Sequence, residues 1–324
     1  MIIGIDTSCY TTSIAVVDEK GSLLAENRRI LEVAAGERGL AQNAALFQHI
    51  REGREVLCSC LEKLDRKDIK AVCVSQSPRP SENSYMPVFF AGVNDAKLLA
   101  AAYGVPVFYT SHQEGHLMAG VKTSEMPQAD SFLAVHLSGG TTELLLVRTA
   151  ETGFEVELLG GSSDLHAGQL VDRTGVLLGL RFPCGPELDK LAESYAGEKH
   201  ILKSSVRGYE FSLSGGEAEV SRRVQDGSVE QGALAQGVFA LLANSLAKVI
   251  NKAADDYNVK SVLLVGGVSG SRYLKKQLQK KLSRSVKAYF APPYYAKDNA
   301  YGVALLGLKQ WQNLQFGKGG HELL

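Results

Sequence analysis

The sequence predicts an α/β protein made of two similar lobes around a cleft. Two strand–turn–strand units carry this prediction. The first joins an apolar run over residues 2–6 to a return strand over 14–18, and the second joins 132–137 to 143–147. Each unit is followed by further strand and helix patterns, which is typical of a duplicated domain. A chain of 324 residues with 45% apolar content is long enough for two lobes that each bury a core.

The composition argues against several broad classes of protein. The 35 basic residues balance the 35 acidic residues, which disfavours a general binder of nucleic acid or membrane surfaces but leaves a local basic face open. The sequence contains no run of about 18 apolar residues, so we expect no membrane span. The apolar opening indicates a buried strand, not a signal peptide. The five cysteines form an odd set, as expected of free thiols in a cytoplasmic protein.

The other elements follow from periodicity and from turn residues. A third strand is expected within residues 20–35. Helices are expected over 42–64, 88–103 and 230–257, and strands over 69–75, 105–108 and 262–265.

The first candidate site is the run His112-Gln113-Glu114-Gly115-His116, which follows a short apolar strand. If a helix begins near Ser111, His112 and His116 lie one turn apart on one face, where both can reach one divalent metal. The alternative is two histidines that pack at a helix start and bind nothing. The run is not a zincin signature, because Glu114 stands two places after the first histidine instead of one.

The turn of the first hairpin is rich in hydroxyl groups. Such a turn offers hydroxyls and backbone N–H groups to a phosphate, with Asp6 near the metal of that phosphate. We take Asp6 and Ser8 as candidate catalytic residues. An ordinary hairpin is the alternative, since Ser and Thr favour turns for local reasons.

The turn of the second hairpin, Ser138-Gly139-Gly140-Thr141-Thr142, repeats this arrangement. Two glycines let backbone amides approach an anion closely, so the repeat favours a phosphate site. His136, on the strand before this turn, is either a further metal ligand or a core histidine.

Three later segments carry weaker signals. Gly266-Gly267 ends an apolar strand, where a nucleotide base or ribose can lie against backbone. The next helix is basic, which is usually a solvated face and less often a phosphate contact. Asp298 precedes the last helix and is either its N-cap or a carboxylate ligand beside His112 and His116.

Taken in order, these motifs resemble the tRNA adenosine threonylcarbamoyltransferase family, formerly described as a glycoprotease family. The resemblance runs from the opening strand to the last helix and implies the duplicated actin-like ATPase fold of sugar kinases, heat-shock chaperones and actin. Seven motifs carry it: the His-x-Glu-Gly-His run at 112–116, Ser138-Gly139-Gly140 with Thr142, Ala167-Gly168 with Asp172, Gly185-Pro186 with Asp189, Phe211-Ser212 with Ser214-Gly215, Gly266-Gly267-Val268 with Arg272, and Asp298-Asn299-Ala300.

The resemblance implies a role for each matching residue. His112, His116 and Asp298 would hold iron or zinc, with His136 as an extra ligand at a position where archaeal-type relatives have a tyrosine. Segment 136–140 would contact the phosphate or carbamoyl end of the ligand. The residues that would bind ATP or threonylcarbamoyl-adenylate, with Mg²⁺ as a further ion, are His136, Leu137, Ser138, Gly139, Gly140, Thr142, Asp172, Gly185, Asp189, Gly267 and Ser271.

The implied reaction is metal-dependent transfer of a threonylcarbamoyl group from its adenylate to N6 of adenosine 37 in tRNA, or a closely related carbamoyl transfer. The chain departs from the family pattern on the ligand side, at Tyr10, Thr11, Gln169 and Ser271, while the metal set is intact. It looks like a divergent bacterial paralogue. The alternative is a non-catalytic paralogue that binds nucleotide and metal and partners a true transferase.

The resemblance also bears on partners and domains. It implies tRNA, a threonylcarbamoyl-adenylate synthase and a small paralogous subunit as partners, and it allows a dimer. No membrane partner is expected. The expected lobes are residues 1–108 with 303–324, and residues 109–302 with inserted helices.

Overall fold

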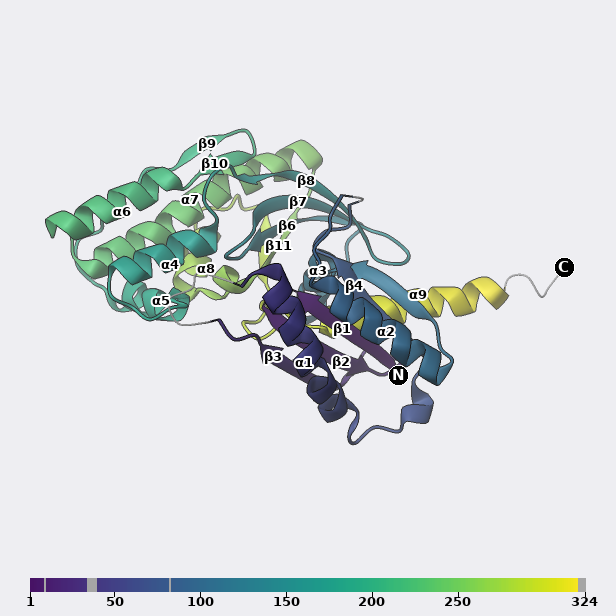
Figure 1. The fold of residues 1–324 in the computed structure, drawn as a ribbon. Helices are drawn as coiled ribbons and strands as arrows, with labels where there is room; N and C mark the ends of the chain where they lie inside the picture. Colours follow the sequence, from purple (N-terminus) through teal and green to yellow (C-terminus); the bar gives the residue numbers. More distant parts are fainter. Residues whose placement is uncertain (9, 34–39, 82, 320–324) are drawn as a thin grey trace. The chain divides into compact units, whose positions relative to one another are not determined.

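The computed structural model describes residues 1–8, 10–33, 40–81 and 83–319 (Figure 1). Its contacts divide the chain into two compact units. Unit 1 comprises Met1–Thr123, Thr149–Glu155 and Lys297–Leu324, and unit 2 comprises Ser124–Arg148 and Val156–Ala296.

Unit 1 is built on a five-stranded sheet with the order β3-β2-β1-β4-β5. The first three strands are antiparallel neighbours, whereas β4 and β5 join them in parallel. A two-residue turn suffices for the antiparallel hairpin, whereas each parallel strand needs a helical crossover. The strands are β1 (Ile2–Ser8), β2 (Thr11–Val17), β3 (Leu23–Ile30), β4 (Ala71–Ser77) and β5 (Val107–Ser111).

Alternation along β1 decides which helices cover which face of this sheet. Ile3 and Ile5 join the apolar core under α1 and α2. Gly4 faces the other way, where a Cβ would lie 2.4 Å from the Ala304 nitrogen of α9, so only glycine permits this contact. The helices of unit 1 are α1 (Gln42–Leu61), η1 (Arg66–Asp68), α2 (Phe89–Tyr103), α3 (His112–Thr123) and α9 (Tyr301–Gly319).

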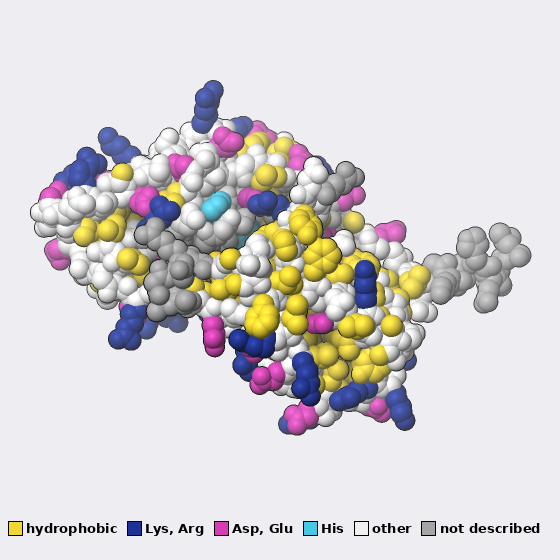
Figure 2. Space-filling view, viewed as in Figure 1, with side chains coloured by type: hydrophobic (Ala, Val, Ile, Leu, Met, Phe, Trp, Pro, Cys, Tyr) yellow, Lys and Arg dark blue, Asp and Glu magenta, His cyan; other side chains and the backbone are white. Residues whose placement is uncertain are grey.

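The outer faces of α1 and α2 expose several large apolar side chains. Phe47 and Ile50 of α1 are 66% and 63% exposed, and Phe90 and Leu98 of α2 are 56% and 62% exposed. Figure 2 shows apolar side chains gathered over these two helices. Exposed apolar groups that gather in one place are typical of a protein-contact surface.

Unit 2 is built on a seven-stranded sheet with the order β12-β11-β6-β7-β8-β10-β9. β6 and β7 form an antiparallel hairpin, and β11 joins β6 in parallel. The strands are β6 (Ser131–Leu137), β7 (Thr142–Thr149), β8 (Phe154–Ser162), β9 (Ser205–Arg207), β10 (Glu210–Ser212), β11 (Ser261–Val265) and β12 (Lys287–Phe290).

The longest helix of unit 2 is α7 (Gln231–Tyr257). By length and composition it could cross a membrane, but 83% of its most apolar window is buried inside the protein. This burial makes α7 the core helix of unit 2. The other helices are α4 (Ala167–Leu177), α5 (Gly185–Ser194), α6 (Ser214–Asp226), η2 (Gly267–Gly270) and α8 (Arg272–Gln279).

The two sheets confirm the predicted duplication. Unit 1 has the order β3-β2-β1-β4-β5, and the core of unit 2 has the same order as β8-β7-β6-β11-β12. In each, a hairpin and a third strand are extended by two parallel strands.

The predicted lobe boundaries differ from the two units in three places. They assign residues 109–123, 149–155 and 297–302 to the second lobe, whereas contacts group all three segments with unit 1. The reason is packing: β5 pairs with β4, and α3 packs so closely on α9 that a Cβ at Gly302 would meet the Gly115 carbonyl.

The described cysteines Cys58, Cys60, Cys73 and Cys184 are free thiols, and Cys9 lies outside the described residues.

Candidate metal centre

A row of polar side chains crosses the sheet of unit 1 near the carboxyl end of β1. Register places Asp6 opposite Ser13, and Ser13 opposite Arg28. Ser75 follows the last registered pair of β1 and β4, so it extends the row to the other side. Directly opposed residues share a face of a sheet, so all four point to the side that carries α9. The apolar alternation of β1 therefore aims a carboxylate at one point above the sheet.

Helix α3 begins directly after β5, at His112. The Glu114 carboxylate accepts hydrogen bonds from the Ser111 backbone nitrogen at 2.9 Å and from the hydroxyls of Ser111 and Thr110 at 2.8 and 3.0 Å. These bonds satisfy donors at the helix start that would otherwise be unpaired. Glu114 is thus held as a cap, which leaves His112 and His116 to share the face one turn apart.

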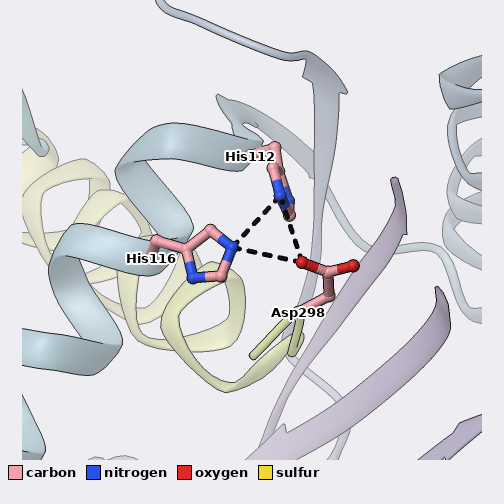
Figure 3. Close-up of side chains that lie close together, drawn as sticks. All are labelled: His112, His116 and Asp298. Atoms are coloured by element: carbon pink, nitrogen blue, oxygen red, sulfur yellow. Dashed lines mark hydrogen bonds and ion pairs between the residues drawn. The ribbon is translucent and has the colours of Figure 1, made fainter. Parts of the chain in front are cut away.

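Three side chains meet at this face of α3 (Figure 3). The Nε2 atoms of His112 and His116 are 3.1 Å apart. Oδ1 of Asp298 lies 3.4 Å from Nε2 of His116 and 3.6 Å from Nε2 of His112. Ligands about 2.0–2.1 Å from a tetrahedral Zn²⁺ are separated by about 3.3 Å. The three atoms therefore have the spacing that one cation requires.

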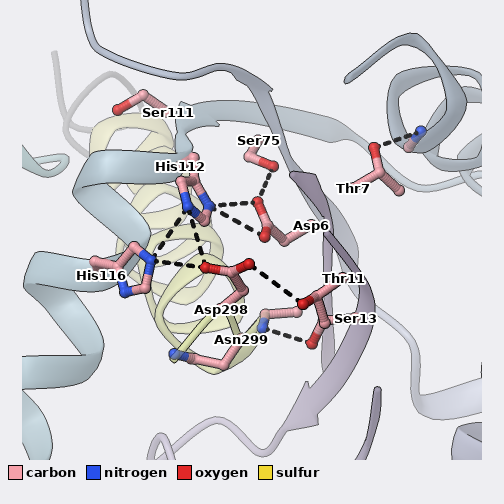
Figure 4. A network of polar contacts seen from close by, with 12 residues as sticks. Asp6, Thr7, Thr11, Ser13, Ser75, Ser111, His112, His116, Asp298 and Asn299 are labelled. Atoms are coloured by element: carbon pink, nitrogen blue, oxygen red, sulfur yellow. Dashed lines mark hydrogen bonds and ion pairs between the residues drawn. The ribbon is translucent and has the colours of Figure 1, made fainter. Parts of the chain in front are cut away.

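Asp298 and the residues after it are held from the sheet of unit 1, and Figure 4 shows the bonds at Thr11 and Ser13. Thr11 donates its hydroxyl to Oδ2 of Asp298 at 3.2 Å, and Arg28 donates to the Asp298 carbonyl at 3.1 Å. The Ala300 nitrogen donates to the hydroxyl of Ser13 at 2.9 Å. The N-cap alternative for Asp298 is wrong, because α9 begins only at Tyr301 and the carboxylate faces the imidazoles.

Asp6 fixes the orientation of His112. Both carboxylate oxygens lie 3.1 Å from Nδ1 of His112, and the Ser75 hydroxyl donates to Oδ1 at 2.5 Å. A carboxylate on one ring nitrogen selects the tautomer that presents the other nitrogen to a metal. Asp6 is fully buried, and in this structure it acts as a positioning residue for His112.

The charges of the centre are strongly coupled. Burial disfavours a charged His112, but the carboxylates of Asp6 and Asp298 outweigh it and raise the pKa of this imidazole to about 9. The pKa values of both carboxyls lie below their usual range, because the imidazoles favour their ionised forms more than burial opposes them. Two carboxylates against one imidazolium leave a negative site, which attracts a cation.

The donor set suits a catalytic metal. Among the described residues, only His112, His116 and Asp298 form a group of three metal-ligating side chains within 4.8 Å. Two imidazoles and one carboxylate leave coordination positions open, as in catalytic zinc sites and in non-haem iron sites. A substrate oxygen can occupy an open position.

In unit 2 the predicted phosphate-binding turn is braced by close backbone contacts. A Cβ at Gly168 in α4 would lie 2.6 Å from the Gly139 nitrogen, and one at Gly266 would lie 2.3 Å from the Leu137 carbonyl. The Gly168 nitrogen donates to the Ser138 carbonyl at 3.0 Å, and the Ala167 nitrogen donates to the Thr142 hydroxyl at 2.7 Å. The turn itself is open, since a Cβ at Gly139 or Gly140 would meet nothing within 4 Å.

Two residues predicted to contact the nucleoside, Asp189 and Asp172, accept hydrogen bonds from backbone nitrogens of unit 2. The Asp189 carboxylate accepts from the Ser271 hydroxyl at 2.5 Å and from the nitrogens of Arg272 and Tyr273 at 2.9 and 3.1 Å. The Asp172 carboxylate accepts from the Cys184 nitrogen at 2.8 Å. These bonds position α8 and the loop before α5, so Asp189 and Ser271 are braces of unit 2 before any ligand binds.

The remaining predicted residues are placed as follows. His136 is the penultimate residue of β6, is 6% exposed and belongs to unit 2, so its part as a metal ligand stays a prediction. Ser8 is buried at the end of β1, and its hydroxyl has no hydrogen-bond partner among the described residues. Gly185 begins α5 and Gly267 begins η2.

Sequence reasoning missed the residues that hold Asp298. Arg28 and Ser13 lie in ordinary strand patterns, and Thr11 counted only as a departure from the family pattern. Alternation along β2 could have shown that Thr11 and Ser13 share one face, but the carbonyl that Arg28 reaches lies 270 residues away.

The fold and this centre define a class of protein. The structure is similar to (R)-2-hydroxyglutaryl-CoA dehydratase component A of Acidaminococcus fermentans, with a TM-score of 0.60, 16% identity and coverage of 96% of this chain and 98% of that chain. It is similar to a ROK family glucokinase from Streptomyces griseus, with a TM-score of 0.53, 14% identity and coverage of 94% and 98%. It also resembles HypF of T. kodakarensis, with a TM-score of 0.58, 13% identity and coverage of 98% and 48%. At these identities the likeness shows the fold alone, and the fold is that of the actin-like ATPases.

Within this fold class the family is also shown. The profile of the tRNA N6-adenosine threonylcarbamoyltransferase family (TsaD) matches residues 35–305, more than four-fifths of the chain. The chain belongs to this family of tRNA-modifying transferases, which confirms the predicted resemblance. His112, His116 and Asp298 all lie within the matched range.

Proposed function

We propose that the protein transfers a threonylcarbamoyl group from threonylcarbamoyl-adenylate to N6 of adenosine 37 in tRNA, with a bound iron or zinc ion. The observation that carries the proposal is the approach of His112, His116 and Asp298 to within 3.1–3.6 Å of one another in a member of a transferase family. In the reaction, N6 attacks the carbamoyl carbon, the bond to the phosphate oxygen breaks, and AMP leaves as N6 loses a proton.

The residues of unit 1 prepare the centre for this reaction. His112, His116 and Asp298 would hold the metal, which supplies Lewis-acid polarisation of the carbamoyl oxygen and orients the adenylate. Asp6 keeps Nε2 of His112 pointed at the centre, and Glu114 keeps the start of α3 helical. Because Asp6 is buried and hydrogen-bonded by Ser75, it supplies this orientation with little reorganisation.

The residues of unit 2 would bind the nucleotide part of the ligand. The open turn Ser138-Gly139-Gly140 exposes backbone that can approach a phosphate, and its bracing by Gly168 keeps it in place. With ATP in place of the adenylate, Mg²⁺ would accompany the phosphates. His136, one residue before the end of β6, would contribute to this nucleotide site.

The test is transfer itself. Protein loaded with Fe²⁺ or Zn²⁺ is supplied with unmodified tRNA and with threonylcarbamoyl-adenylate made in place by its synthase, and the modified nucleoside is measured by mass spectrometry. We expect transfer by the native protein and by the control His200→Ala, which changes a histidine of unit 2. We expect loss of more than about 100-fold in His116→Ala, because a metal ligand is missing. Metal-loaded native protein that transfers nothing would overturn the proposal.

The second candidate is a non-catalytic paralogue that binds nucleotide and metal and assists a true transferase. The substitutions on the ligand side, such as Gln169 and Ser271, favour it. The two functions separate in the same assay, since the second predicts no transfer alone and stimulation of an added transferase.

The proposed setting is the cytoplasm, where the tRNA and the synthase are found. A small paralogous subunit is the expected protein partner, and a dimer is the expected form of association. The apolar side chains that α1 and α2 expose support a protein partner of this kind.

A further inference from the structure

The basic residues of this chain are concentrated in one segment. Residues 257–297 contain nine lysines and arginines and no aspartate or glutamate. The whole chain has 35 of each sign, so the rest of it carries a net charge of −9. A segment of one sign in a neutral protein is a local field, and local fields of this kind attract polyanions.

Helix α8 displays this charge on one face. Tyr273, Leu274 and Leu278 are buried against the unit. Lys275 and Lys276 lie on the exposed side, and Lys280, Lys281 and Arg284 continue it beyond the end of the helix. We refer to Arg272, Lys275, Lys276, Lys280, Lys281 and Arg284 as the α8 basic surface.

The backbone that carries the α8 basic surface is held at both ends. At the start, Asp189 accepts hydrogen bonds from the nitrogens of Arg272 and Tyr273. At the end, Asn251 of α7 donates to the Lys281 carbonyl at 3.2 Å and accepts from the Ser283 nitrogen at 2.9 Å. The cations therefore project from a rigid element and keep their spacing when a ligand binds.

The cations of this surface are not neutralised within the structure. None of the ion pairs among the described residues includes a member of the α8 basic surface. Asp256 on the neighbouring α7 is paired with Lys252 at 2.6 Å, and Asp189 is used by backbone and by Ser271. Interaction with the helix dipole accounts for a cation in the last turn but not for six of them.

Aromatic rings accompany the cations. The Lys275 ammonium lies 4.9 Å above the Phe290 ring of β12. Tyr294, which is 55% exposed, follows β12 beside Pro293, and a Cβ at Gly270, just before α8, would lie 3.8 Å from the Pro293 side chain. Cations together with exposed rings are the features with which proteins bind RNA, since phosphates need charge and unpaired bases need a surface for stacking.

We propose that the α8 basic surface binds the sugar–phosphate backbone of the tRNA. The inference rests on the proposed function for the identity of the RNA, and it assigns a place on unit 2 to a part of that RNA away from the modified base. The charge on the rest of the chain is negative, so this surface governs the salt dependence of RNA binding.

The experiment compares two triple variants that remove the same charge. Lys276→Gln/Lys280→Gln/Lys281→Gln changes the surface, and Lys63→Gln/Lys67→Gln/Lys70→Gln changes three exposed lysines of unit 1. Binding of a fluorescent, unmodified tRNA transcript is measured by anisotropy between low and moderate salt. We expect the first variant to weaken binding roughly tenfold and to reduce the salt slope by about 2 to 3, since each lost phosphate contact removes about 0.9. The second variant should bind like the native protein.

Several outcomes would overturn the proposal. They are equal weakening in both triple variants, an unchanged slope in the first, no tRNA binding by the native protein, and tighter binding to phosphatidylserine vesicles than to tRNA. The outcome is independent of the proposed reaction, because binding is measured without the adenylate. If the native protein binds tRNA through the α8 basic surface but transfers nothing, only the proposed reaction is refuted. If the first triple variant transfers normally and binds tRNA as the native protein does, only the proposed binding surface is refuted.

Discussion

The two units repeat one strand order but end their first hairpins in different chemistry. In unit 1 the hairpin ends beside a buried carboxylate, Asp6, whose partners Ser75 and His112 are also side chains. In unit 2 the equivalent hairpin ends in Ser138-Gly139-Gly140, which is open and is braced through backbone. The same fold thus carries a charged side-chain centre in one copy and a bare backbone turn in the other.

The difference shows what each copy contributes. A cation site needs ionised or lone-pair donors with fixed orientation, and in unit 1 cross-strand hydrogen bonds fix that orientation. A phosphate site needs N–H groups that an anion can approach, and in unit 2 glycines and close helix contacts keep such groups accessible. Topology is common to both, and the residues at the strand ends divide the work between metal and nucleotide.

The substitution with the largest expected effect on one unit alone is Asp298→Ala. It removes one of three ligands, so we expect divalent-metal affinity to fall by more than about 100-fold while nucleotide binding by unit 2 is unchanged. Titration calorimetry with Zn²⁺ and with a nucleotide measures the two separately. Asp130→Ala, which changes an exposed carboxylate of unit 2, is the control. Metal binding that survives Asp298→Ala would refute the ligand set.

The matching break in unit 2 is Gly168→Ala. The added methyl group would lie 2.6 Å from the Gly139 nitrogen, so we expect a loss of about 1–3 kcal/mol in the free energy of unfolding. Urea denaturation measures this loss. Gly215→Ala is the matched control, because Gly215 is also the second residue of a helix and its Cβ would meet nothing within 4 Å. Equal effects of the two substitutions would show that the brace is absent.

Arg28→Lys sharpens the comparison by testing the support of Asp298. The lysine can keep the ion pair with Glu26, but it cannot also donate to the Asp298 carbonyl as the guanidinium does. We expect metal affinity to fall by about tenfold while the melting temperature of the metal-free protein changes little. The neighbouring Arg29→Lys is the control, since its side chain is 48% exposed and pairs with Glu52 and Glu55. If Arg28→Lys lowers the melting temperature of the metal-free protein but not its metal affinity, Arg28 only stabilises the fold and does not position Asp298.

The smallest expected effect is a pH dependence of stability and metal affinity, which we expect from the metal centre of unit 1 and not from unit 2. The pKa of His112 is raised to about 9 in the folded protein, so its imidazolium stabilises the metal-free fold fully below about pH 6.5 and less as pH rises through 9. Metal affinity should rise over the same range, because the ligand must lose its proton. Thermal melts of metal-free protein from pH 6 to 10 check this. His112→Gln should flatten the profile and His200→Gln should not; a native profile that rises with pH would contradict the assignment.

Part of this centre could be predicted because helical spacing is a local property. His112 and His116 lie one turn apart in any helix that includes both, and α3 does begin at His112. Asp298 could be named as a candidate metal ligand from the sequence. Whether it is a helix cap or a ligand could not be decided there, because this depends on where α9 begins. Arg28, Ser13 and Ser75 could not be found in this way, because their role comes from the register of four strands.

Sequence by itself determined the duplicated α/β plan and the family, since hairpins, glycine turns and helical periods are set by neighbours within a few residues. The tertiary structure alone decided that Asp6 serves His112 and that Asp298 faces two imidazoles. These outcomes depend on hydrogen bonds between residues that are 69 to 287 positions apart in the sequence, where strand pairing and helix packing, and not local preference, choose the partner.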